Sequence, residues 1–153
     1  MYIHTMKAVV DPAAVEDMAG CFCLAMRKAA RAVTRYYDRA LRAHGLRATQ
    51  LSILVAASQR DSIPSTRMAQ VLGLDRTTLL RNVRPLVRRR LLEVSQDHHS
   101  HRTEVRATTA GRALLRRLYP DWKRAQGQTL KGLKGAGWTR GLEALGQVVR
   151  SGR

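Results

Sequence analysis

The chain has 153 residues, a length that fits one domain with a sizeable hydrophobic core. Its 28 Lys and Arg against 11 Asp and Glu give a formal net charge of +17. That excess points to a polyanionic partner, either nucleic acid or an anionic membrane surface. No run approaches the ~18 apolar residues that a membrane span needs, and no charged-then-apolar signal segment opens the chain. We therefore expect DNA as the partner, no membrane contact and a cytoplasmic location.

The first third of the chain predicts two helices. Asp11 and Pro12 predict a helix start, and the following residues favour helix up to His44. Gly45 is expected to end this helix as its C-cap. Apolar side chains recur along this helix at three-to-four spacing: Phe22, Met26, Ala29, Val33, Tyr36 or Tyr37, and Ala40. A second helix is expected over 48–58, with Leu51, Leu54 and Val55 inward, followed by a loop over 60–64.

Residues 65–107 predict a winged helix-turn-helix. A short helix opened by Pro64 and Ser65 is followed by a tight turn at Gly73, and Asp75 can cap the next helix. The apolar positions expected to be buried are Met68, Ala69 and Leu72 in the first helix, and Leu79, Leu80, Val83, Leu86 and Val87 in the second. Pro85 is expected to bend the second helix or end its regular part.

The second of these helices has the chemistry of a DNA-reading helix. Six arginines and no acid lie between Arg76 and Arg90. Arginine forks bind guanine, asparagine binds adenine, threonine contacts a thymine methyl or a phosphate, and a helix N-terminus attracts phosphate. The alternative is a solvated basic face, but the helix-turn-helix context favours DNA. We predict DNA contacts from Ser65, Thr66, Arg76, Thr77, Thr78, Arg81, Asn82, Arg84 and Arg88.

Two short strands, expected over 91–95 and 103–107, enclose the turn QDHHSHR and form a candidate wing. The side chains that would lie near the negative minor groove are His98, His99, His101 and Arg102. A solvated loop and a metal site are the alternatives. Asp97 is the sole carboxylate beside the histidines, so we predict neither a metal nor another cofactor.

The rest of the chain predicts two more helices. Thr108 caps a helix that runs to about Lys134 with a kink at Pro120, and glycines at 132, 135 and 137 mark its end. A final helix covers 138–149. The predicted fold class is mainly α with a small β-hairpin wing.

The arrangement from about Ala19 to Val149 resembles the MarR family of bacterial transcriptional regulators. The resemblance rests on RKAARAVTRYYDRALRAHGLRATQLSIL, on MAQVLGLDRTTLLRNVRPLVRRRLL, and on the segments TTAGRALL and PDWKRAQ. It implies one domain over 1–153, with dimerisation helices over 11–45 and 109–150 and a DNA-binding lobe over 48–107. It also implies a homodimer that binds a palindromic operator, usually as a repressor, and a small molecule or oxidant that shifts DNA affinity.

The sequence departs from the family pattern in two places. Arg90 stands where most relatives carry glycine, so either a non-glycine residue accepts left-handed backbone at about 1 kcal/mol or the helix ends differently. In the wing, Asp97 and Arg102 are the nearest equivalents of the family's Asp-Arg-Arg.

Cys21 and Cys23 are the two cysteines of the chain. Positions i and i+2 of one helix point about 200° apart, which disfavours a disulfide within the chain, and without a CxxC pair a structural zinc site is not expected. By resemblance to peroxide-sensing relatives, Cys23 lies eleven residues before Thr34, and Tyr37 matches a family tyrosine. Two further tyrosine positions hold Arg27 and Ala48. We therefore favour a packed structural Cys23 over a redox sensor, which stays the alternative.

The resemblance also places an effector near Arg31, Tyr36, Tyr37 and His44, where an aromatic or anionic small molecule would fit. Dimer packing or surface charge is the alternative explanation for the same residues.

Two alternatives to a ligand-responsive regulator remain. One is a constitutive basic DNA-binding protein of low specificity. The other is an enzyme, which we do not expect because no catalytic triad, phosphate loop or carboxylate pair is present.

Overall fold

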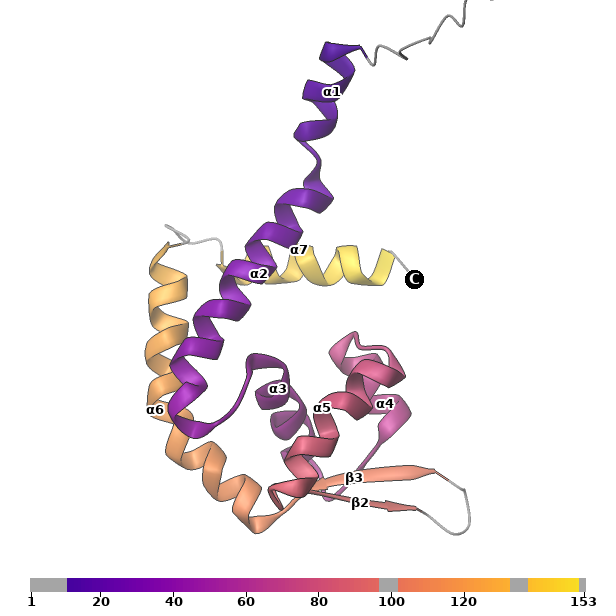
Figure 1. The fold of residues 1–153 in the computed structure, drawn as a ribbon, viewed down its shortest axis with the longest axis vertical. Helices are drawn as coiled ribbons and strands as arrows, with labels where there is room; N and C mark the ends of the chain where they lie inside the picture. Colours follow the sequence, from indigo (N-terminus) through magenta and orange to yellow (C-terminus); the bar gives the residue numbers. More distant parts are fainter. Residues whose placement is uncertain (1–10, 97–101, 133–137, 152–153) are drawn as a thin grey trace, which may run out of the picture. The chain divides into compact units, whose positions relative to one another are not determined.

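The computed structural model describes residues 11–96, 102–132 and 138–151 (Figure 1). The chain divides into two compact units, Met1–Arg35 and Tyr36–Arg153. Within the described ranges, no helix combines the length and apolar character needed to cross a membrane.

The first unit holds helix α1 and the beginning of helix α2. Helix α1 (Pro12–Ala19) starts as predicted, with the Asp11 carboxylate accepting the Ala13 N–H at 3.1 Å. A break then separates it from α2 (Phe22–Leu41), so the prediction of one continuous helix from Pro12 to His44 is wrong. Gly20, which disfavours helix, ends α1 because its N–H and that of the next residue each turn back to a carbonyl three residues earlier.

In the second unit, α2 ends at Leu41 and continues as one 3₁₀ turn, η1 (Arg42–His44). Gly45 closes it with a φ of 64°, which confirms the predicted glycine cap. Helix α3 (Ala48–Ser58) has the predicted bounds. The Asp38 carboxylate accepts the N–H of its first residue at 2.7 Å and thereby ties α3 to α2.

The core of the second unit is built around α3, which buries Leu51, Ile53, Leu54, Ala56 and Ala57. Because α3 is apolar on almost every side, its spacing does not reveal which side faces inward, and the prediction that Val55 is buried is wrong: it is 39% exposed. Val87, also predicted to be buried, is 36% exposed. Among the described residues, the core contains no buried polar or charged side chain.

Helices α4 (Ser65–Leu72) and α5 (Arg76–Arg88) form the predicted helix-turn-helix. Gly73 makes the turn between them with a φ of 62°. Met68 is fully buried, whereas Ala69 and Leu72 pack against the core in part. Pro85 does not end α5, which continues for three more residues.

A three-stranded antiparallel sheet with the order β1-β3-β2 completes the winged helix. Strand β1 (Ile63–Pro64) falls in a segment predicted to be loop, and Ile63 pairs with Val105 of β3 (Thr103–Ala107). Strand β2 (Leu92–Gln96) begins one residue later than predicted, because Leu91 still donates to the Leu86 carbonyl of α5. The hairpin itself is confirmed.

Two helices follow the sheet. Helix α6 (Thr109–Gly132) is capped as predicted, since the Thr108 hydroxyl oxygen accepts the Gly111 N–H at 3.0 Å. It contains Pro120 and bends part-way along its length (Figure 1). It ends two residues before the predicted Lys134, which lies outside the described residues together with Gly135 and Gly137. Helix α7 (Trp138–Ser151) extends slightly beyond its predicted end.

Candidate DNA-binding surface

Helix α5 carries four exposed side chains in one narrow stripe. Thr77, Arg81, Arg84 and Arg88 recur at i, i+4, i+7 and i+11, which places them within about 60° of arc at 100° per residue. We call these four residues the reading stripe. The buried Leu79, Val83 and Leu86 point the opposite way into the core. The stripe therefore combines three permanent positive charges with one hydroxyl on a rigidly held surface.

The beginning of α5 is fixed by Asp75. Its carboxylate accepts the Thr78 N–H at 2.8 Å and the Thr78 hydroxyl at 2.6 Å. These hydrogen bonds hold the pKa of Asp75 below its usual value. The Thr78 hydroxyl thus serves the cap, and the predicted Asn82 donates its side-chain N–H to the Thr78 carbonyl at 2.8 Å. Both side chains are therefore already hydrogen-bonded at the start of α5 in the absence of DNA.

The N-terminus of α4 contributes the other predicted contacts. Ser65 is half-buried and Thr66 is exposed. The adjacent Arg67 is also exposed, with a long contact of 3.5 Å to Gln70. Our sequence reasoning missed Arg67, although a cation in the first turn of the first helix of a helix-turn-helix was a readable signal.

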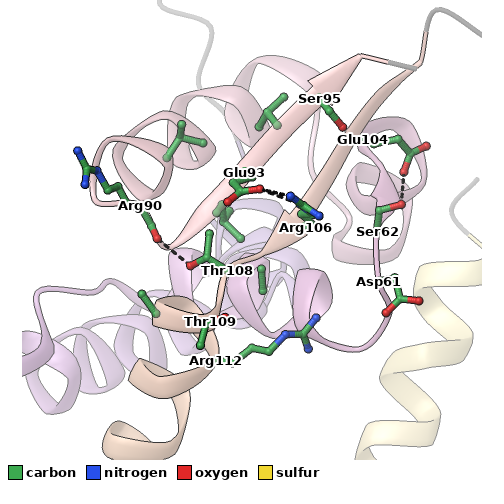
Figure 2. Close-up of a pocket in the computed structure, with 15 residues that line it drawn as sticks. Asp61, Ser62, Arg90, Glu93, Ser95, Glu104, Arg106, Thr108, Thr109 and Arg112 are labelled. Carbon is green, nitrogen blue, oxygen red and sulfur yellow. Dashed lines mark hydrogen bonds and ion pairs between the residues drawn. The ribbon is translucent and has the colours of Figure 1, made fainter. Parts of the chain in front are cut away.

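The wing separates its apolar and polar residues onto two faces. Leu92, Val105 and Ala107 are buried. On the other face Arg106 donates to Glu93 at 2.8 Å across the two strands, and Ser62 donates to Glu104 at 2.9 Å (Figure 2). The groove along this face mixes acids (Asp61, Glu93, Glu104) with arginines (Arg90, Arg106, Arg112). Its charges balance, so this face lacks the uniform positive character of the reading stripe.

The wing tip is described in part. Arg102 is exposed immediately before β3, whereas His98, His99 and His101 lie outside the described residues. Within the ranges that the structure covers, no group of three His, Cys, Asp or Glu side chains is arranged to hold a metal ion.

Three of the four predicted effector residues contact α6. Tyr36 and Tyr37 donate their hydroxyls to Gln128 and Gln126, and the His44 ring lies 2.8 Å from Asp121. Burial raises the pKa of Tyr37, and the hydrogen bond from His44 holds the pKa of Asp121 below its usual value. Arg31 is exposed on α2, in the other unit. The structure thus brings Tyr36, Tyr37 and His44 to one helix, α6.

Both cysteines are exposed. Cys21 lies in the break between α1 and α2, before the first residue of α2. The argument that the two thiols diverge as i and i+2 of one helix therefore does not apply. The burial expected of a structural Cys23 is also absent from this single chain.

An apolar cavity of about 310 Å³ lies between α3, α4 and α6. Its walls are mainly aliphatic and aromatic, with Ser52 and Gln59 as the two polar residues: Leu51, Ser52, Val55, Ala56, Gln59, Val71, Leu72 and Trp122. The exposed Val55 and Val71 belong to this lining, which accounts for apolar side chains left outside the core. Our sequence reasoning did not find this cavity because its residues come from three separated segments.

The fold was compared with solved structures. The Mycobacterium tuberculosis transcriptional regulator MosR, solved in complex with DNA, is 30% identical; the match covers 86% of this chain and 96% of MosR, with a TM-score of 0.77. This chain belongs to the MarR family of transcriptional regulators. A MarR-family regulator from Rhodococcus sp. RHA1 matches at 21% identity and a TM-score of 0.75, covering 91% of this chain and 96% of that one.

A third structure with a similar fold is CouR from Rhodococcus jostii RHA1, solved with p-coumaroyl-CoA. It is 20% identical, with a TM-score of 0.75, and the match covers 86% of this chain and 94% of CouR. No protein-family model matches the sequence, and a search of curated proteins finds no match. The assignment to the MarR family therefore rests on the fold together with the identity to MosR.

Proposed function

We propose that this MarR-family chain represses transcription by binding a palindromic DNA operator as a homodimer, with the reading stripe of α5 in the major groove. The observation that carries the proposal is the stripe itself. Its three arginines make no side-chain hydrogen bond or ion pair with other described residues, so they are available to phosphates and base edges. MosR, the 30% identical relative, was solved with DNA.

Exposed apolar side chains in the first unit support a second copy of this chain as partner. Val15, Met18, Phe22, Leu24 and Val33 are between 42% and 66% exposed. A twofold dimer would cover such surface and would present two reading stripes to two half-sites, hence the palindrome. In this proposal 11–45 and 109–150 form the dimerisation lobe and 48–107 the DNA-binding lobe of a single domain.

We further propose that a small organic effector regulates DNA binding from the apolar cavity. Its volume suits an aromatic molecule, and Ser52 and Gln59 offer hydrogen bonds for orientation. The residues Tyr36, Tyr37 and His44 are less suited, because their polar groups are already paired with α6. CouR, which has a similar fold, was solved with p-coumaroyl-CoA.

Selection of duplexes from a random pool tests the proposed function. We expect an inverted repeat to be enriched and bound by a dimer, as measured by sedimentation of the complex. Arg81→Ala should weaken binding by about 1–3 kcal/mol and relax preference at one base pair per half-site. Arg88→Ala, further along the stripe, should weaken selected and random duplexes alike. Enrichment of no sequence would instead favour a basic DNA-binding protein of low specificity.

The exposure of both cysteines favours one second candidate, a thiol-based peroxide sensor acting through Cys23. If the chain is such a sensor, organic hydroperoxide should release DNA from wild type and from Cys21→Ser but not from Cys23→Ser. Mass spectrometry of the treated protein identifies the oxidised thiol. Release that is the same in all three proteins would remove this candidate.

A further inference from the structure

Arg89 differs from the arginines around it. Its guanidinium donates one hydrogen bond to the Gly45 carbonyl at 2.5 Å and a second to the His44 carbonyl at 3.0 Å. The neighbouring Arg88 makes no side-chain hydrogen bond or ion pair with another described residue. The C-cap residue of the reading helix, Arg89, is therefore bound to the end of η1, and we call this pair of hydrogen bonds the Arg89 clamp.

The partner of the clamp is a helix end with unpaired carbonyls. The last carbonyls of a helix attract a cation, and an arginine fork can serve two neighbouring oxygens at once. Gly45 leaves room for this approach, because a Cβ at that position would lie 3.3 Å from the Arg89 Nη1. Its φ of 64° also suits glycine. The missing Cβ thus suits the arginine, and the positive φ is a separate reason for glycine at this position.

The same turn is attached to α6. The ring of His44, whose carbonyl the clamp uses, lies 2.8 Å from the Asp121 carboxylate, which also meets Arg124 at 3.1 Å. The next residue, Trp122, lines the apolar cavity. Hydrogen bonds at the backbone and at the ring of His44 therefore connect the end of α5 to Asp121, which precedes the cavity-lining Trp122 in the chain.

We propose that Arg89 is a positioning residue for sequence recognition: it holds the reading helix at a fixed angle through η1, and the His44–Asp121 pair extends this support to α6. Arg89 then contributes to DNA specificity without touching DNA. This proposal rests on the proposed function, because it concerns how the α5 stripe meets base edges. In this proposal, a ligand bound beside Trp122 would change the position of the reading helix through the same contacts.

Salt-dependent DNA binding tests the proposal with Arg89→Gln and the matched control Arg88→Gln. Each variant removes one charge from adjacent exposed positions. We expect Arg89→Gln to lower affinity for the selected duplex about tenfold more than for random duplex, which is about 1.4 kcal/mol of specificity, with an unchanged salt slope. Arg88→Gln should weaken both duplexes alike and make the slope shallower by about 1.8, because a dimer loses two phosphate contacts at about 0.9 each. Arg89→Lys, which keeps the charge but loses the fork, should recover part of the specificity.

Two outcomes overturn the proposal. A shallower slope with an unchanged ratio of selected to random affinity would make Arg89 a phosphate contact. Lower stability in urea with unchanged DNA binding would make it a purely structural residue. A double-mutant cycle of Arg89→Gln with Asp121→Asn adds a further check, because support through one turn predicts non-additive losses of specificity.

Hydrogen exchange on the DNA-free protein keeps this test separate from the proposed function. Arg89→Gln should raise amide exchange over 42–47 and 86–91, whereas Arg88→Gln should not. If wild type prefers no duplex, the proposed function fails and recognition by Arg89 fails with it, while exchange still reports the clamp. Unchanged exchange in Arg89→Gln overturns the proposal whatever the DNA results.

Discussion

Gly111 shows how a single hydrogen atom can decide the junction between the wing and α6. A Cβ at this buried position would lie 2.2 Å from the Leu91 carbonyl oxygen. That oxygen is fixed by the N–H and the hydroxyl of Thr108. The first turn of α6 can therefore approach the backbone before β2 only because residue 111 has no side chain.

We expect Gly111→Ala to lower the free energy of unfolding by about 1–3 kcal/mol, because the clash is with backbone rather than with a flexible side chain. Gly127→Ala is the control in the same helix, since its Cβ would meet no atom within 4 Å. There, alanine should stabilise α6 by up to about 1 kcal/mol. Urea denaturation of the two variants measures both effects. A Gly111→Ala protein as stable as wild type would mean that α6 can shift away from Leu91.

Arg90 is the sole described non-glycine residue with a left-handed backbone, at a φ of 56°. The sequence comparison with the family left two possibilities, and the structure confirms the left-handed one. We expect Arg90→Gly to raise the free energy of unfolding by about 1 kcal/mol through relief of this strain. Arg90→Ala, which removes the same charge but keeps a Cβ, should bring no such gain. Equal stability of the two variants in urea would contradict this explanation.

At the scale of the helix, the Asp75 cap makes the stability of the start of α5 depend on pH. Its folded pKa is lowered by the hydrogen bonds from Thr78, so the ionised cap stabilises the fold above the ordinary carboxyl range, near 4. That contribution is lost as the pH falls through the lower, folded pKa. Asp75→Ala should therefore have a lower urea midpoint than wild type at pH 7, and the difference should shrink at pH 2–3.

Asp75→Asn is the matched variant for this test. An asparagine oxygen can still accept the Thr78 N–H but does not ionise in this range. Its stability relative to Asp75→Ala should therefore not depend on pH between 2 and 7. A wild-type advantage over alanine that persists undiminished at pH 2 would argue against the carboxylate as its source.

The elements that the sequence predicted well are those whose signals are local. The Asp11, Asp75 and Thr108 caps and the turns at Gly45 and Gly73 depend on a residue and its nearest neighbours, and all of them are confirmed. The missed break at Gly20 is local as well, whereas the missed strand depends on a distant partner. Strand β1 exists because Ile63 pairs with a strand more than thirty residues later.

The features of the candidate site also differ in whether they depend on local sequence or on distant segments. The exposed stripe of α5 follows from helical period alone, so it could be read from the sequence. The role of Arg89 could not, because the six arginines between 76 and 90 look alike in the sequence until a carbonyl from another segment is placed beside one of them. The apolar cavity could not be predicted from the sequence either, since it forms only where α3, α4 and α6 pack together.

For the whole molecule, the charge of +17 predicts salt-steep DNA binding. If a dimer neutralises about eight phosphates, log K should fall with log salt at a slope near −7. Fluorescence anisotropy of a labelled duplex between about 50 and 300 mM salt measures this slope. A value shallower than about −3 would show that most of the excess charge is not used on DNA.

The apolar composition of the described core has a consequence for the unbound protein. Since no charged or polar side chain is buried there, the like charges of this chain gather in its outer layer, where they repel one another and oppose compaction. Dissolved ions screen this repulsion over roughly 10 Å. The same ions that detach the protein from DNA should therefore raise the melting temperature of the free chain. A bound duplex also neutralises these charges, as counterions do. The folded protein should therefore have its lowest melting temperature at low ionic strength without DNA.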